Sequence, residues 1–152
     1  MPTPFIAGNW KMNTTVSEGE ALVKGMLPRL KAAKGVTTVL CPPFTSLAPI
    51  AKLLQGTNVL LGAQNMHPEP KGAYTGEVSP AMLAGLCRYV ILGHSERRHI
   101  FGETDEFVNK KVKAALDYGL TPILCVGERL EENRSGRAEE VVTRQVEGGL
   151  AD

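Results

Sequence analysis

Cysteine is scarce in this sequence and is not arranged in pairs. The three cysteines, Cys41, Cys87 and Cys125, lie far apart, and no two of them form a Cys-x-x-Cys motif. An odd number of widely spaced thiols argues against both a disulfide framework and a structural zinc site. We therefore expect reduced thiols, and we expect Cys41 and Cys125 to pack in or at the ends of apolar strands.

The sequence also lacks a signal peptide, a membrane-spanning run and an excess of charge of one sign. Residues 1–10 do not show a charged region followed by an apolar one, and no apolar run approaches the roughly 20 residues that cross a bilayer. Lysine and arginine total 17 against 16 acidic residues, for a net charge of +1. These absences predict a soluble, cytoplasmic protein whose partners include neither nucleic acid nor membrane.

Two nucleotide-binding motifs are missing as well. No Gly-x-Gly-x-x-Gly follows the first apolar run, and no Gly-x-x-x-x-Gly-Lys-Ser/Thr occurs anywhere. Because both motifs place backbone N–H groups against phosphates, their absence argues against dinucleotide-binding and P-loop folds.

What the sequence does contain is a regular alternation of short apolar runs and longer amphipathic ones. A length of 152 residues with 43% hydrophobic residues suits a single domain. Strands are predicted at residues 5–10, 37–41, 58–63, 89–92 and 121–126, and helices at residues 16–33, 46–54, 80–86, 105–118 and 138–150.

Capping residues support several of these helix boundaries. Ser17 and Glu20 have the spacing of a capping box, Ser79 precedes Pro80 as an N-cap followed by a first-turn proline, and Gly119 indicates a helix end. Five strands separated by helices imply a parallel sheet, because right-handed crossovers place successive strands side by side. The fold class is therefore α/β. A sheet wound in one direction curls toward a barrel, and an open doubly wound sheet is the alternative.

One predicted strand is followed by a histidine at the start of a charged turn. Residues 89–98 read Tyr-Val-Ile-Leu-Gly-His-Ser-Glu-Arg-Arg, so that His94 stands just beyond the C-terminal end of an apolar strand. Parallel strands end at the ligand crevice of α/β folds, and the following helix start points backbone N–H groups there. His94 is therefore a candidate acid, base or electrophile, and the alternative is a histidine that only caps a helix.

The first strand ends in a second polar pair. Alternation places Asn9 and Lys11 on the same side of the chain as it leaves the sheet. A hydrogen-bonding amide and a cation then project together, and Lys11 can neutralise a phosphate or a developing enolate in a partly desolvated site. The alternative for Lys11 is a solvated lysine in a turn.

The charged residues after His94 favour support of a site over direct chemistry. Glu96, Arg97 and Arg98 suit a structural ion-pair network, and the arginines can also meet an acidic residue on a partner subunit. His94 and His99 are five positions apart and would not share a helix face, which argues against a metal site.

Five motifs together resemble the triosephosphate isomerase family in order and spacing, over essentially the whole chain. They are Gly8 to Asn13, Gly62 to Asn65, Gly72 to Ser79, Gly93 to Arg98 and Cys125 to Glu128. The resemblance implies a TIM-type (β/α)8 barrel and an enzyme that interconverts dihydroxyacetone phosphate and glyceraldehyde 3-phosphate through an enediolate. It implies no metal and no organic cofactor.

The resemblance also implies roles for individual residues. Asn9 and Lys11 match the pair that binds the triose phosphate substrate, and Lys11 and His94 match catalytic positions, with His94 as the electrophile that polarises the carbonyl. The resemblance also implies that this imidazole is neutral, because a helix N-terminus disfavours its protonated form. Glu96 matches an acid near Lys11, and Ser95 stands beside it in support of the site. Thr75 matches the tip of a loop that contacts the neighbouring subunit in the family's dimers.

The family barrel has eight βα units in about 250 residues, and only five strands are predicted here. By resemblance, the other three units carry the glutamate general base, the lid and the phosphate-gripping loops. We therefore expect a truncated barrel of about five βα units whose activity alone is very weak or absent. We expect it to form a homo-oligomer or to bind a complementary C-terminal half. The alternatives are a non-catalytic, oligomerising half-barrel that retains relic site residues, and a module that only binds a phosphate ligand.

Overall fold

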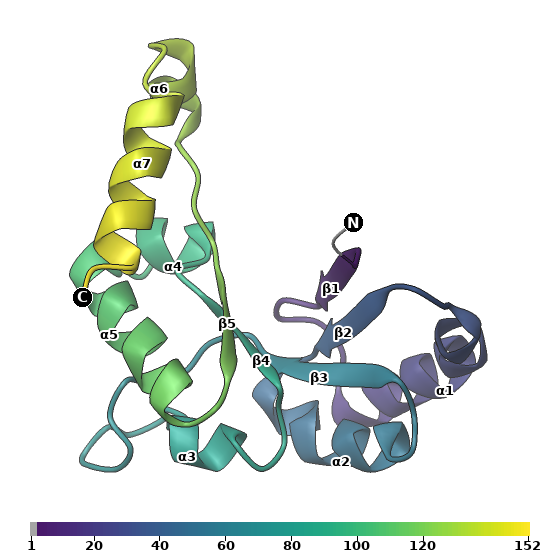
Figure 1. Cartoon of the computed structure of the whole chain (residues 1–152). Coiled ribbons are helices and arrows are strands. Elements are labelled where there is room, and N and C mark those ends of the chain that lie inside the picture. The colour runs from purple at the N-terminus through teal and green to yellow at the C-terminus, as the bar shows by residue number, and fades with distance from the viewer. Residues whose placement is uncertain (1–2) are drawn as a thin grey trace.

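The computed structural model describes residues 3–152, and its centre is a curved sheet of five parallel strands (Figure 1). The strands pair in sequence order, with each hydrogen-bonded to the strands before and after it in the chain. They are β1 (Phe5–Asn9), β2 (Thr37–Cys41), β3 (Val59–Ala63), β4 (Tyr89–Leu92) and β5 (Thr121–Leu124). Consequently β1 and β5 are the two edges of the sheet.

Helices connect the strands and cover one face of the sheet. They are α1 (Val16–Ala32), α2 (Phe44–Leu54), α3 (Pro80–Leu83), α4 (Ser95–His99), α5 (Asp105–Asp117), α6 (Leu130–Arg134) and α7 (Ala138–Gly149). The apolar side chains of α1, α2 and α5 belong to one core with those of β2, β3 and β4, and α7 packs on α5 (Figure 1). This one-sided winding confirms the half-barrel and rules out the doubly wound alternative.

Alternate strand residues divide the interior into two apolar layers. Leu40, Leu61 and Val90 face the helices in the larger core. Val39 and Ile91 point to the opposite, concave face, where a smaller cluster includes the buried Cys41 and the half-buried Cys125. The expectation that these two thiols pack at strand ends is confirmed, and all three cysteines are free.

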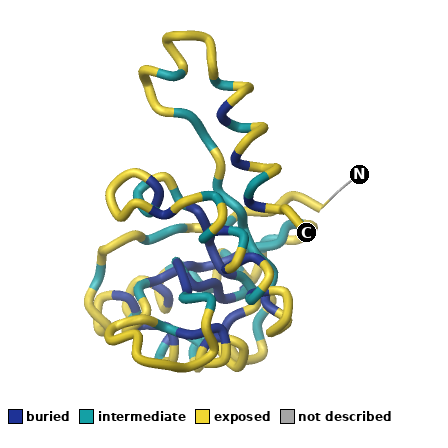
Figure 2. Tube along the Cα trace, turned by 90° about the vertical axis from the view of Figure 1, so that its left-hand side faces the viewer, coloured by how far each residue is buried: buried dark blue, intermediate teal, exposed yellow. Residues whose placement is uncertain are grey.

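The two edges of the sheet are more exposed than its centre. On β1, the Phe5 side chain is 43% exposed and that of Ile6 is 62% exposed, whereas Val39 on the neighbouring strand is fully buried. The side chains of β5 are half-buried along the whole strand. Figure 2 shows that burial is concentrated in the sheet and its covering helices, while the segment carrying α6 projects from them and is mostly exposed.

The N-terminal cap of α1 differs from the prediction. Thr15, and not Ser17, is the N-cap: its hydroxyl accepts a hydrogen bond from the backbone N–H of Glu18 at 3.4 Å, and the Glu18 carboxylate accepts one from the Thr15 N–H at 2.7 Å. Thr15-x-x-Glu18 and Ser17-x-x-Glu20 both have the capping-box spacing, so spacing alone could not choose between them. Ser79 caps α3 as predicted.

Other boundaries shift by a few residues. The predicted helix at residues 80–86 ends at Leu83, and residues 84–86 form a turn in which the N–H groups of Leu86 and Cys87 both bond to the Leu83 carbonyl. The short helices α4 and α6 are not predicted, since five residues are too few to show a helical period. No helix within residues 3–152 has both the length and the apolar character needed to cross a membrane.

Candidate active site

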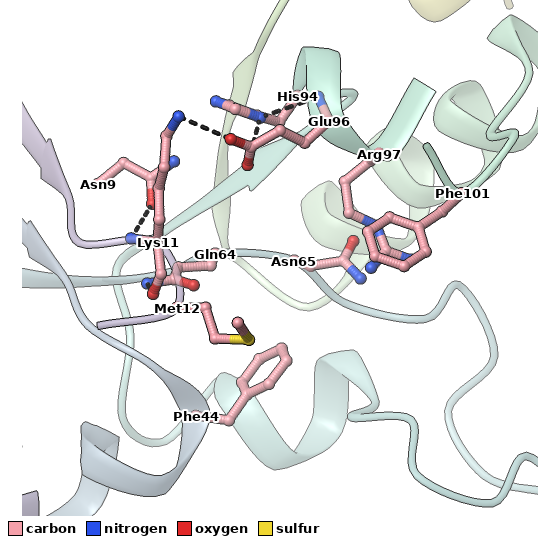
Figure 3. A pocket seen from close by; sticks show the side chains of 10 residues that line it. All are labelled: Asn9, Lys11, Met12, Phe44, Gln64, Asn65, His94, Glu96, Arg97 and Phe101. Carbon is pink, nitrogen blue, oxygen red and sulfur yellow. Dashed lines mark hydrogen bonds and ion pairs between the residues drawn. The ribbon is translucent and has the colours of Figure 1, made fainter. Parts of the chain in front are cut away.

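Polar side chains from three strand ends surround one cavity of about 220 Å³ at the C-terminal edge of the sheet (Figure 3). Asn9 and Lys11 come from the end of β1, Gln64 and Asn65 from the end of β3, and His94 from the end of β4. The remaining lining residues are Met12, Phe44, Glu96, Arg97 and Phe101. The C-terminal edge of a parallel sheet is where ligands bind in such folds, and the sequence-predicted Asn9, Lys11, Glu96 and His94 meet there.

Lys11 occupies this edge in an uncommon backbone conformation. Its φ is +55°, a left-handed value that a non-glycine residue adopts only when its surroundings hold it. The Lys11 N–H donates to Asn9 Oδ1 at 3.0 Å. The Gln64 side-chain amide donates to the Lys11 carbonyl at 2.9 Å and to the Cys41 carbonyl at 2.8 Å. Gln64 was given no role by sequence reasoning, although an amide directly after a buried strand is a recognisable signal.

The Lys11 ammonium group is paired with Glu96. Lys11 Nζ lies 2.7 Å from Glu96 Oε1. The hydrogen bond from Lys11 lowers the pKa of Glu96 below its ordinary 4.5, against an opposing effect of partial burial. Because both side chains are about half exposed, the pair contributes little to stability, and its main effect is to fix the direction of the Lys11 side chain.

His94 is the N-cap of α4, and its ring is oriented by the helix that it caps. His94 Nδ1 accepts a hydrogen bond from the backbone N–H of Glu96 at 3.3 Å. Nδ1 also lies 3.4 Å from Glu96 Oε2, a contact that attracts only when Nδ1 carries a proton. We assign Nδ1 as the acceptor of the backbone bond, because the Glu96 N–H can only donate and Nδ1 must then be without a proton. In a neutral ring the proton is then on Nε2, which becomes the donor available to a ligand.

A buried ionic cluster stands behind the cavity wall. Glu103 Oε1 accepts hydrogen bonds from Arg97 Nε at 2.8 Å and from Lys111 Nζ at 2.6 Å. Lys111 Nζ also donates to Asn65 Oδ1 at 2.9 Å. Burial lowers the pKa of Lys111, and the hydrogen bond to Glu103 acts in the opposite direction.

The arginines of the predicted network thus find their acids within the chain: Arg97 pairs with Glu103, and Arg98 pairs with Asp105. No sequence signal singled out Lys111 or Glu103, because a lysine and a glutamate beside or on an amphipathic helix look like solvated residues until the structure shows that they are buried.

Ser95 and Thr75 lie outside this cavity. Ser95 is exposed and lines a neighbouring cavity together with His94, Arg98 and Cys125. Thr75 is exposed at the tip of the loop 64–78. That loop is folded on itself, with the rings of His67 and Tyr74 4.0 Å apart between centroids.

The described part of the chain contains no cluster of three histidine, cysteine or acidic side chains that could hold a metal ion. His99 does not join His94; its Nδ1 accepts a hydrogen bond from Arg129 Nε at 3.1 Å. Burial, and then the positive charge of Arg129, lower the pKa of His99.

Comparison with known proteins identifies relatives for the whole described fold. A sequence model of the triosephosphate isomerase family matches residues 4–152. The chain is 56% identical over 152 residues to the triosephosphate isomerase of Carboxydothermus hydrogenoformans, and 57% identical over 151 residues to that of Symbiobacterium thermophilum. The crystal structure of triosephosphate isomerase from Bartonella henselae superposes with a TM-score of 0.94 at 43% identity, covering 99% of this chain and 63% of that one.

The similarity covers nearly all of this chain but only part of each relative. The two bacterial sequences are matched over 99% of this chain, which spans 61% and 59% of their respective lengths. The match with the family model extends over far more than half of the chain. The chain belongs to the triosephosphate isomerase family.

Proposed function

We propose that this chain carries the electrophilic part of a triosephosphate isomerase site, which interconverts dihydroxyacetone phosphate and glyceraldehyde 3-phosphate through an enediolate. The observation that carries the proposal is the convergence of Asn9, Lys11 and His94 on one cavity at the strand ends of this family's fold. A ketose or aldose carbonyl bound there would lie near a hydrogen-bond donor, the His94 ring, and a cation, the Lys11 ammonium group.

The proposed electrophilic step uses His94 and Lys11. The Nε2–H group of His94 donates a hydrogen bond to the substrate carbonyl oxygen. The ammonium group of Lys11 stabilises the negative charge that develops on that oxygen. Donors that are fixed before the reaction provide this stabilisation without reorganising. The backbone bond to His94 Nδ1 and the ion pair of Lys11 with Glu96 provide that fixation.

The proton-abstracting base is assigned to a segment outside residues 3–152. Glu96 is the acid among the described residues that line the cavity, and its carboxylate is engaged by Lys11. A lowered pKa makes Glu96 a poor proton acceptor near neutral pH. By the family resemblance, a glutamate of the later βα units supplies the base, either in the same polypeptide or in a complementary one.

Two partner contacts belong to the same proposal. A second copy is placed at the loop 64–78, whose exposed tip carries Thr75. A complementary set of strands is placed at β1 and β5, whose outer backbone edges have no neighbour among the described strands. Apolar side chains are exposed on β1 and half-buried on β5.

The test is an isomerisation assay with glyceraldehyde 3-phosphate. The purified chain is assayed alone and after mixing with the remaining C-terminal part of a close relative, with His94→Gln and Lys11→Ala as site variants. We expect activity in the mixture and a loss of about 10²-fold or more in kcat for His94→Gln, as for removal of one fixed hydrogen-bond donor.

Two results would count against the proposal. If a C-terminal part that demonstrably binds gives no activity, the non-catalytic half-barrel is the better description. If activity survives both substitutions unchanged, the assignment of these residues is wrong. Circular dichroism of each variant separates a lost fold from a lost function.

A further inference from the structure

We propose that Arg98 is a positioning residue of this site: its guanidinium group holds the backbone from which His94 projects and ties it to β5 and α5. The catalytic consequence rests on the function proposed above, whereas the positioning itself does not. Arg98 lies on the side of α4 away from the substrate cavity and is absent from the lining of that cavity.

The guanidinium group bonds to three separate elements. Arg98 Nε donates to the Gly93 carbonyl at 2.7 Å, at the end of β4. Nη1 donates to Asp105 Oδ1 at 2.5 Å, in the first turn of α5, and Nη2 donates to the Cys125 carbonyl at 3.3 Å, just after β5. The rigid fork of an arginine suits three acceptors in fixed directions, and a lysine ammonium cannot reproduce it.

The Gly93 peptide links Arg98 to His94 directly. The carbonyl that Arg98 holds belongs to the peptide bond whose nitrogen is that of His94. Gly93 has a φ of +68°, and a Cβ placed on it would lie 2.8 Å from Arg98 Nη2. The turn from β4 into α4 therefore fits closely around the guanidinium group. A rotation of this peptide would turn His94 away from the Glu96 N–H that orients its ring.

Asp105 pairs with the guanidinium group of Arg98 and holds it in place. The Arg98 side chain is only 6% exposed, and a buried cation without a partner is strongly destabilising. Asp105 Oδ2 also lies 3.6 Å from Arg144 Nε, a contact with an exposed side chain of α7. Gly148 of α7 packs on Asp105 so closely that a Cβ at that position would lie 2.8 Å from the Asp105 Cβ. The direction of His94 is thus set by contacts that extend to α7.

The test measures the orientation of His94 without requiring activity. The 15N resonances of the His94 ring and the backbone amide resonance of Glu96 are recorded for the chain and for Arg98→Lys, Asp105→Asn and Arg144→Lys. We expect both sets of resonances to shift in Arg98→Lys and Asp105→Asn. Arg144→Lys is the matched control, because Arg144 contacts Asp105 from the surface and does not contact β4. In this variant the His94 and Glu96 resonances should keep their wild-type positions.

A purely structural role predicts a different result. In that case Arg98→Lys lowers the melting temperature, while the His94 and Glu96 resonances of the folded protein keep their wild-type positions, and this outcome overturns the proposal. If Arg98→Lys does not fold, Asp105→Asn, which keeps the guanidinium group and nearly the same volume, decides in the same way.

The kinetic consequence is measured in the active mixture described above. We expect Arg98→Lys to lower kcat by about tenfold or more with KM changed by less than about threefold, because a misplacement near 1 Å can cost up to about 10²-fold in rate. An unchanged kcat with shifted resonances overturns the catalytic consequence. If the wild-type mixture is inactive, the proposed function fails, and the resonances alone decide whether Arg98 positions His94.

Discussion

Lys11 combines a strained backbone with a fixed side chain, and the two features come from different neighbours. Gln64 holds the Lys11 carbonyl, whereas Glu96 holds its ammonium group. Fixing both ends of a flexible residue removes freedom that a substrate would otherwise have to restrict on binding. The site thus begins as a set of local constraints on single residues.

The ion pair of Lys11 and Glu96 makes a pH-dependent contribution to stability. The pKa of Glu96 is lower in the folded protein than its ordinary 4.5, so the folded state binds fewer protons at this group than the unfolded state. Its contribution is therefore complete above about pH 5 and disappears as the pH falls through the folded pKa. Urea unfolding of the wild type and of Glu96→Gln should show a small difference near neutrality that vanishes in acid. A difference that grows toward acid would contradict this assignment.

The three thiols should differ in reactivity. Burial raises the pKa of Cys41 and of Cys87 to about 12, and it raises the pKa of Cys125 while the charge of Arg98 opposes the shift. The thiolate is the reactive form, and Cys125 is half-buried beside a cavity whereas the other two are buried. Peptide mapping after treatment with iodoacetamide at neutral pH should find Cys125 labelled first. Cys41 and Cys87 should react only in urea, and equal labelling of all three in the folded chain would refute this order.

At the scale of elements, the cap of α1 offers a direct comparison between two hydroxyl residues. Thr15→Ala removes the acceptor for the Glu18 N–H and should lower the free energy of unfolding by about 1 kcal/mol. Ser17→Ala is the matched control, because Ser17 lies inside the helix and should change stability by less than about 0.5 kcal/mol. Urea unfolding of both variants measures the difference. A larger loss for Ser17→Ala would mean that Ser17, and not Thr15, caps the helix.

The elements could be predicted from the sequence where a periodic pattern is long enough to read. Each of the five strands carries a run of apolar residues, and α5 shows its helical period over 13 residues. The short helix α4 could not be predicted in this way, because five residues are too few to show a helical period and because Arg98 is held by a contact with the distant Cys125 carbonyl.

The residues of the candidate site also fall into those that the sequence could predict and those that it could not. Asn9, Lys11 and His94 could be found because each lies at or just beyond the C-terminal end of a predicted strand, and parallel strand ends gather at one edge. Lys111 and Asp105 could not be found, because a lysine or an aspartate on an amphipathic helix resembles any solvated residue of the exposed face. Their roles depend on burial, which only the folded structure reveals.

At the scale of the whole molecule, exposed apolar groups mark the surfaces that a partner would cover. Ile6 on the β1 edge is 62% exposed, and Phe101 at the mouth of the cavity is 64% exposed. Met12, beside Lys11, is 97% exposed. Such groups near open strand edges favour association, and they lie on both sides of the candidate site. Partner binding and completion of the site are therefore expected to be coupled.

The loop 64–78 provides a test of self-association that leaves the cavity residues of the same chain unchanged. Its tip residue Thr75 is exposed and lines neither the candidate active-site cavity nor the neighbouring cavity beside Ser95. In the function proposed above, this tip contacts a second copy beside that copy's site, as the family resemblance implies. Thr75→Arg adds bulk and charge at the tip and should shift the mass measured by light scattering toward the monomer, because a buried unpaired charge opposes association.

Thr143→Arg is the matched control for that experiment, since Thr143 is exposed on α7 and should leave the mass unchanged. The effect of Thr75→Arg should grow with dilution, because association depends on protein concentration. A stable, compact monomer for the unmodified chain at all concentrations would rule out self-association through this loop. Equal dissociation by both substitutions would show that added charge acts without regard to position, and the dimer contact would then have to lie elsewhere.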